Sequence, residues 1–425
     1  MKLTAATARP PGAATLVATG CGTAIACVCA VGLLAIERQT GGVWSVLAVL
    51  VAALLCAAVA RALARLTAVV PSGVGLLAFL SRGLGRRWAL ALMLPYVAIV
   101  LGLVALEARI VGAVIAHIAP VPPLAGALAF LFGTWAVARA GVRPGLRAQA
   151  AATWVLIGGF ALLALAAMVQ AGADGTLAAR LLPAAPAPLA FVGAVGQAIF
   201  LFMGFELVTT QIELVRSPAA IGSALRRSVW VLALFYAVAA LGLAAAAPAT
   251  TPGAAAAALA APQLVLVPAV AGTIGAAGIG LLCVLASFTS WNGALLTLSR
   301  LVYALATQGL LPRGLARMDS KRLVPPNALG ALLGVAAVLT VAVAGPAPAT
   351  VVLAAAAAIA AVVWAAALAV RQRAPFAEAA RPQLRRASGF AVAALLVAFG
   401  VGALAEALVS LAPAPTNQGE LARAH

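Results

Sequence analysis

Acidic side chains and histidines are scarce in this sequence: its 425 residues include nine Asp and Glu and two His. They are scattered, so they do not predict the clustered polar groups that a membrane enzyme would need. No P-loop motif is present, which argues against ATP-driven transport by this chain alone. The five cysteines lie in apolar runs without a histidine at metal-ligand spacing, so we expect buried side chains and neither a metal nor a cofactor.

Charge of either sign is also rare. Charged residues make up 8% of the chain and hydrophobic residues 65%, with a mean hydropathy of +1.14. A soluble domain carries about a quarter charged residues, so lipid must surround most of this chain. At about 20 residues per membrane helix, the apolar runs predict a single polytopic domain over 1–412, a short polar tail at 413–425 and no twelfth helix. The eleven predicted spans are 12–36, 43–65, 88–116, 121–138, 149–171, 187–212, 227–247, 266–298, 325–344, 347–370 and 388–412.

The basic residues predict the orientation. The net charge of +18 would suit a nucleic-acid partner, but the 27 Lys and Arg fall in short clusters between the apolar runs. With the N-terminus in the cytoplasm, all but Arg38, Arg109, Arg180 and Arg423 lie in cytoplasmic segments, and Arg109 lies within a span. Such an excess is typical of the cytoplasmic side of helical membrane proteins. The pattern predicts a multi-pass protein of the plasma membrane (a bacterial inner membrane), with a cytoplasmic N-terminus, an uncleaved first span and no nucleic-acid partner.

Two spans have glycines near their middle. The first span contains Thr19-Gly20-Cys21-Gly22-Thr23, and the sixth contains Phe202-Met203-Gly204-Phe205-Glu206. Glycine at this depth permits a break, and freed backbone groups are tolerated there only inside protein or against a cavity. Interrupted helices at matching positions of two halves point to a transporter site. The alternative is that the glycines serve only close helix packing.

The two interrupted spans are five apart, which predicts an inverted repeat. The halves would cover 12–171 and 187–370, with an extra helix at 388–412. The outer half of the first span would begin near Thr23, and its free amides would favour an anion. The outer half of the sixth would end near Phe202, and its free carbonyls would favour a cation. A zwitterion such as an α-amino acid would satisfy both.

Several motifs resemble one known family. Gly204-Phe205-Glu206-Leu207-Val208-Thr209-Thr210 is followed by Glu213 and Pro218, and Ala286–Ala294 by Ser299-Arg300-Leu301-Val302-Tyr303-Ala304. With Pro71-Ser72-Gly73-Val74-Gly75, these stretches resemble the amino acid–polyamine–organocation permeases in the order of their motifs. The chain departs from the family pattern at Arg65, where many members have Glu, and in lacking the common twelfth helix.

This resemblance implies an all-α membrane protein of the LeuT type, with five plus five helices, discontinuous helices 1 and 6, and alternating access. It also implies the substrate contacts. These are Gly20, Cys21, Gly22 and Thr23 in helix 1, Phe202, Met203 and Gly204 in helix 6, with Phe202 and Phe205 as aromatic gates, and Trp291 or Asn292 in helix 8.

Four charged residues need separate interpretation. Glu206 follows the predicted break in helix 6, and it would either carry a proton or cap the inner half-helix. Glu213 is expected to form a structural ion pair with Arg216. Glu107 lies about 30 Å of helix past the start of its span, which favours a place near the outer surface over a role in coupling. No lysine lies in the fifth span, so coupling would use a proton on Glu206, or transport would be exchange alone.

The sequence therefore predicts a secondary transporter, and not an enzyme, that moves amino acids or related amines. Its partners would be this small substrate, membrane lipid and, where transport is coupled, protons. An amino acid exporter of the same family is one alternative, since the motifs leave the direction of transport open. The other is a membrane sensor or scaffold that does not transport, which large soluble domains would favour; the sequence shows none.

Overall fold

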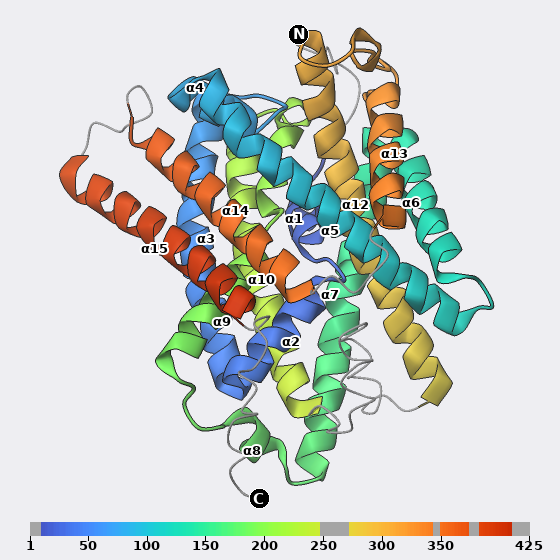
Figure 1. Ribbon diagram of the computed structural model, residues 1–425, viewed down its shortest axis with the longest axis vertical. Helices are drawn as coiled ribbons and strands as arrows, with labels where there is room; N and C mark the ends of the chain where they lie inside the picture. The colour runs from blue at the N-terminus through green and yellow to red at the C-terminus, as the bar shows by residue number, and fades with distance from the viewer. Residues whose placement is uncertain (1–9, 247–271, 343–348, 374–381, 410–425) are drawn as a thin grey trace, which may run out of the picture.

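A computed structural model describes residues 10–246, 272–342, 349–373 and 382–409 (Figure 1). The described part is helical apart from one isolated bridge between Asp319 and Val324. Among the described residues, eight helices are long and apolar enough to cross a membrane, and a bent pair forms a further span. Two helices of 17 residues, α6 (Pro123–Arg139) and α13 (Pro326–Ala342), are also apolar. The eight long helices, the bent pair and these two shorter helices correspond in order to the eleven predicted spans. The predicted tail at 413–425 lies outside the described residues.

The remaining long helices are α3 (Gly42–Val69), α5 (Arg86–Ile118), α7 (Val142–Ala173), α10 (Pro218–Ala246), α12 (Gly272–Thr307), α14 (Ala349–Arg371) and α15 (Pro382–Val409). Short helices α4 (Leu76–Leu84), α8 (Leu177–Leu181) and η3 (Arg313–Leu315) lie in connections. The extra helix α15 packs against α14 and α9 (Pro188–Phe200). In Figure 1, α4 and α8 lie at opposite ends of the molecule, which separates Arg82 on α4 from Arg180 on α8.

The packing is that of a protein surrounded by lipid. Small residues contribute to the helix contacts, with Ala48, Ala52 and Ala60 of α3 fully buried. Many large apolar side chains face outward, including Leu162, which is 69% exposed. Close helix packing through small residues is what membrane proteins use where no water drives association.

The first and sixth spans are both interrupted. The first consists of α1 (Ala13–Ala24) and α2 (Cys29–Thr40), bent by 66° across residues 25–28. In the sixth, α9 ends at Phe200 and a 3₁₀ segment, η1 (Phe205–Leu214), begins after four residues. Because α1 packs against η1 and α2 against α9, the two breaks lie side by side.

The break in helix 1 lies further along the chain than predicted. Gly20, Cys21, Gly22 and Thr23 remain helical, and the chain leaves the helix only at Ile25. Thr23 Oγ1 donates to the carbonyl of Thr19 at 2.5 Å, a bond back to the preceding turn that is compatible with the helix. The break in helix 6 lies at the predicted place, around Gly204.

Candidate functional site

Gly204 brings the two broken helices together. Its φ of +113° lies in the left-handed region, which favours glycine. A Cβ at this position would lie 2.6 Å from the carbonyl oxygen of Thr23. Any larger residue would therefore strain the backbone and push helix 6 away from the end of α1.

Glu206 stabilises the start of η1. The phenol of Tyr96 donates to one carboxylate oxygen of Glu206, and the amide of Gly204 donates to Oε2 at 3.0 Å. Thr209 Oγ1 donates to the carbonyl of Glu206 at 2.7 Å. A carboxylate that accepts the amide at the start of a helical segment is a helix cap. These contacts favour capping, one of the two roles that the sequence left open. They also connect α5, through Tyr96, to the break between α9 and η1.

The carbonyl groups freed in helix 1 are partly satisfied by neighbouring helices. The phenol of Tyr236 donates to the carbonyl of Ala24 at 2.9 Å, and the Cys29 thiol donates to the same carbonyl at 3.3 Å. Thr289 Oγ1 reaches the carbonyl of Ile25 at 3.5 Å. Broken backbone at this depth requires such partners.

The residues of the helix 1 glycine motif pack against neighbouring helices. A Cβ on Gly20 would lie 2.5 Å from Ser228 Oγ on α10, and one on Gly22 would overlap Thr153 Oγ1 on α7. Cys21 is buried, with its Sγ 3.7 Å from the carbonyl of Ser228. These three residues thus have the close-packing role that the sequence allowed as an alternative, and they lie beside the cavity described below without lining it.

The predicted aromatic residues are buried in the same region. Phe202 lies against Tyr236, with ring centroids 6.1 Å apart, and Phe205 lies 5.5 Å from the Trp364 ring of α14. Trp291 is fully buried on α12. None of the three lines the cavity, so their role as gates or substrate contacts stays a prediction.

Asn292 belongs to a polar cluster between α1, α7 and α12. Its side-chain amide donates to the Gly145 carbonyl at 3.1 Å and to Gln149 Oε1 at 2.8 Å. Gln149 Nε2 in turn donates to the carbonyl of Thr289 at 2.8 Å, and Thr153 Oγ1 donates to the Ala18 carbonyl at 3.2 Å. Gln149 joins α7 to α12, and Thr153 joins α7 to α1. Neither residue was assigned a role from the sequence.

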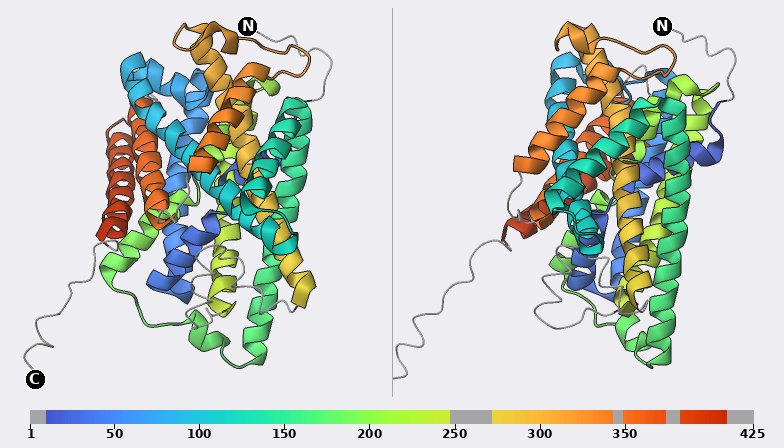
Figure 2. Two further views of the ribbon diagram at one scale, coloured as in Figure 1. Left: turned by 45° about the vertical axis from the view of Figure 1, so that its right-hand side comes forward. Right: turned by 90° about the vertical axis from the view of Figure 1, so that its right-hand side faces the viewer.

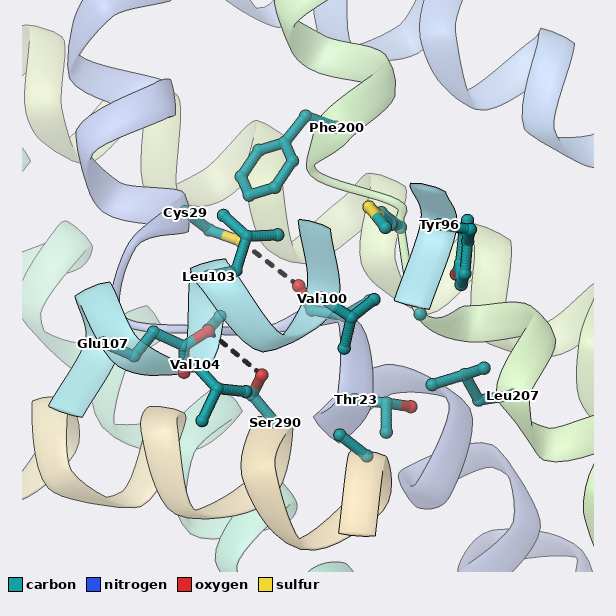
Figure 3. Close-up of a pocket in the computed structure, with 15 residues that line it drawn as sticks. Thr23, Cys29, Tyr96, Val100, Leu103, Val104, Glu107, Phe200, Leu207 and Ser290 are labelled. Carbon is teal, nitrogen blue, oxygen red and sulfur yellow. Dashed lines mark hydrogen bonds between the residues drawn. The ribbon is translucent and has the colours of Figure 1, made fainter. Parts of the chain in front are cut away.

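A cavity lies beside the two breaks (Figure 3). Of the predicted residues, Thr23, Met203 and Gly204 line it. One wall comes from α5, because Tyr96, Val100, Leu103, Val104 and Glu107 recur at the three- and four-residue spacing of one helix face. The other lining residues are Ala24, Ala26, Cys29, Phe200, Leu207, Ser290 and Ala294.

Glu107 is not near the surface, contrary to the sequence-based expectation. Its side chain is 2% exposed and lines the cavity, where Oε1 accepts a hydrogen bond from Ser290 Oγ at 3.2 Å. Only an upright helix would place Glu107 near the outer surface. The 33 residues of α5 span about 50 Å, more than the ~30 Å apolar core, and α5 runs diagonally across the molecule (Figures 1 and 2). The sequence did contain a signal for this place: Glu107 shares a helix face with the apolar residues Val100, Leu103 and Val104.

Glu213 also has a different partner from the one predicted. It pairs with Arg300 of α12, at 3.4 Å, and not with Arg216. Arg300 donates as well to the carbonyl of Thr210, at 3.0 Å. The pair therefore joins α12 to η1, whereas Arg216 would have been a purely local partner.

The glycines in the loop between α3 and α4 pack against η1, the same segment. Gly75 has a φ of +51°, and a Cβ there would lie 2.5 Å from Thr209 Oγ1. A Cβ on Gly73 would lie 2.6 Å from Glu213 Oε1. The glycine loop that resembles the permease motif thus packs on η1, close to the ion pair.

Within the described residues, the nine spans, the two shorter apolar helices and the adjacent breaks define a membrane transporter of LeuT fold. Similar solved structures include MhsT in complex with L-phenylalanine, at 15% identity over 92% of this chain and 98% of that chain, with a TM-score of 0.61. A Na⁺-coupled sialic acid symporter in a substrate-bound outward-open state matches at 11% identity over 96% and 91%, with a TM-score of 0.60. A manganese transporter of Eremococcus coleocola matches at 14% over 97% and 89%, with a TM-score of 0.56.

The sequence model of the amino acid permease family matches residues 16–412, and the chain belongs to this family. It is a secondary transporter and not an enzyme. A search of curated proteins finds no match.

Proposed function

We propose that this permease carries an amino acid or related amine in the cavity between α5, α12 and the two breaks, by alternating access. The observation that carries the proposal is the contact of Gly204 with the end of α1, which places two interrupted helices against one cavity. Broken backbone beside a cavity supplies free amides and carbonyls for the two charged groups of an amino acid. The apolar lining residues Val100, Leu103 and Met203 would contact its side chain.

The substrate contacts include the predicted Thr23, Met203 and Gly204. The sequence singled out Glu206 as a candidate coupling group. Its two hydrogen bonds, from Tyr96 and from the amide of Gly204, support the capping role instead. Coupling to protons and exchange of substrates both remain compatible with the fold. The basic residues support a cytoplasmic N-terminus in the plasma membrane.

The test is a counterflow screen in proteoliposomes across the amino acids and polyamines. Gly204→Leu should abolish counterflow of the substrate that the screen identifies, because its side chain would collide with Thr23 and its φ would be strained. Gly334→Leu is the matched control, since Gly334 lies exposed on α13 with nothing within 4 Å of an added Cβ. Equal flux in the two variants would overturn the proposed site.

A further inference from the structure

Glu107 contributes the carboxylate among the residues that line the cavity, and half of that carboxylate has no partner. Its Oε1 accepts from Ser290, but Oε2 is buried and makes no hydrogen bond to any described residue. Figure 3 shows the side chain lying with Ser290 at the cavity. A carboxyl group buried in a membrane protein needs a proton or a cation to offset the lost hydration.

The part of the chain that the structure describes offers this carboxylate no basic partner. The titratable groups that interact with it are the Cys29 thiol and the Tyr236 phenol, and both donate to the carbonyl of Ala24. On α5 itself, Arg109 is two residues away and so lies on a different face. Of the helices packed on α5, α13 carries no charged residue and the others carry one arginine each: Arg82, Arg139, Arg300 and Arg371.

The other carboxylate beside the cavity does not compete for the same role. Glu206 has donors on both oxygens, from Tyr96 and from the amide of Gly204. Around Glu107, Ser287 and Ser290 lie one turn apart on the same face of α12, and both lie next to the carboxylate. Their hydroxyl groups can stabilise the carboxylate while it is ionised, and Oε2 stays available to a ligand.

We propose that Glu107 binds, in turn, a proton and the cationic side-chain group of a transported basic amino acid or polyamine. The inference rests on the proposed substrate cavity and specifies its ligand. When the ammonium or guanidinium group binds, Glu107 releases its proton to the water on that side of the membrane. When the cation leaves on the other side, the carboxylate takes up a proton there. One proton thus crosses against each singly charged substrate, and the exchange moves no net charge.

The rest of the lining suits such a substrate. Val100, Leu103 and Val104 lie on the same face of α5 as Glu107, at the spacing that would cover the methylene stem of a lysine, ornithine or arginine side chain. Residues of the two breaks, among them Thr23 and Gly204, line the same cavity and would lie next to the α-amino and carboxyl groups. The substrate would then be recognised at three groups: its side-chain cation, its α-amino group and its carboxyl group.

The experiment compares wild-type and variant proteins in proteoliposomes loaded with arginine, ornithine or putrescine, with leucine and methionine as neutral probes. Wild type should exchange the basic probes and accumulate them when an outward-directed proton gradient is imposed. A potassium-diffusion potential should leave uptake of arginine and ornithine unchanged, whereas putrescine carries two charges, moves one net charge per proton and should respond to the potential. Glu107→Gln should lose about 30-fold or more in exchange of the basic probes, as expected for removing one partner of a buried charge pair. Glu107→Asp, which keeps the charge, should retain exchange with a raised KM.

Glu37→Gln is the control, because the Glu37 carboxylate lies on α2 outside the cavity and both its oxygens have donors, the amide of Gly42 and the hydroxyl of Ser45. It should transport like wild type. Exchange of neutral probes alone, or basic exchange in Glu107→Gln equal to that of wild type, would overturn the inference. If Gly204→Leu abolishes flux while Glu107→Gln does not, this inference fails and the proposed cavity stands.

Discussion

Replacing Tyr96 with Phe tests whether Glu206 is a structural cap. The change removes only the hydroxyl that donates to the Glu206 carboxylate, while the amide of Gly204 still donates to Oε2 at 3.0 Å. A hydrogen bond to a charged group contributes about 1.5–3 kcal/mol to stability. We expect Tyr96→Phe to lower the free energy of unfolding by that amount, measured by titrating the purified protein with SDS in mixed micelles.

The same measurement on Glu206 completes a double-mutant cycle. Gln at 206 can still accept from Gly204 and donate to the Tyr96 oxygen, which can act as donor or acceptor. Glu206→Gln should therefore be milder than Glu206→Ala, and it should keep the pH profile of transport. The Tyr96→Phe and Glu206→Ala changes should be coupled by about 0.5–3 kcal/mol, as residues in direct contact are. Strict additivity, or a flattened pH profile in Glu206→Gln, would refute capping and return Glu206 to the role of proton carrier.

Three further predictions concern other parts of the chain. Asn292→Leu should cost about 1–3 kcal/mol in the same unfolding assay, because it leaves buried Gln149 Oε1 without its donor; an unchanged free energy would remove the polar cluster from the stabilising contacts. A cysteine at Arg180 should react with an impermeant maleimide from outside the cell and one at Arg82 from inside, and the reverse pattern would invert the orientation. Backbone hydrogen bonds from Arg322 and Lys321 hold the pKa of Asp319 below its usual value. The ionised carboxylate therefore stabilises this turn fully at a pH above the usual pKa of aspartate. Protection of the Arg322 amide from hydrogen exchange should be lost as the pH falls through the lowered pKa.

The sequence predicted the spans well because the thickness of the bilayer sets the length of each apolar run, and basic residues are concentrated in the connections between runs. It also placed the break in helix 6, since Gly204 has a backbone conformation that only glycine adopts easily. It misplaced the break in helix 1 because Gly20 and Gly22 are small for packing reasons, and the two uses of glycine look alike in a sequence.

The cavity wall formed by α5 was not predicted, for a different reason. Tilt is set by packing against neighbouring helices and is not encoded in the length of an apolar run. An upright helix would place Glu107 at the surface, and the diagonal α5 places it in the cavity. The partner of Glu213 was missed because Arg300 lies 87 residues away in sequence, and such pairs are visible only once helices 6 and 8 are side by side.

The contact between Gly204 and Thr23 has a mechanical consequence. With no side chain between them, the backbones of helices 1 and 6 touch directly at their breaks. Neither helix can tilt alone without separating from the other, so we expect the two to move as one rigid unit. The bonds from this unit to its surroundings, Tyr236 to Ala24 and Tyr96 to Glu206, would then be the ones that lengthen or exchange partners when access to the cavity passes from one side of the membrane to the other.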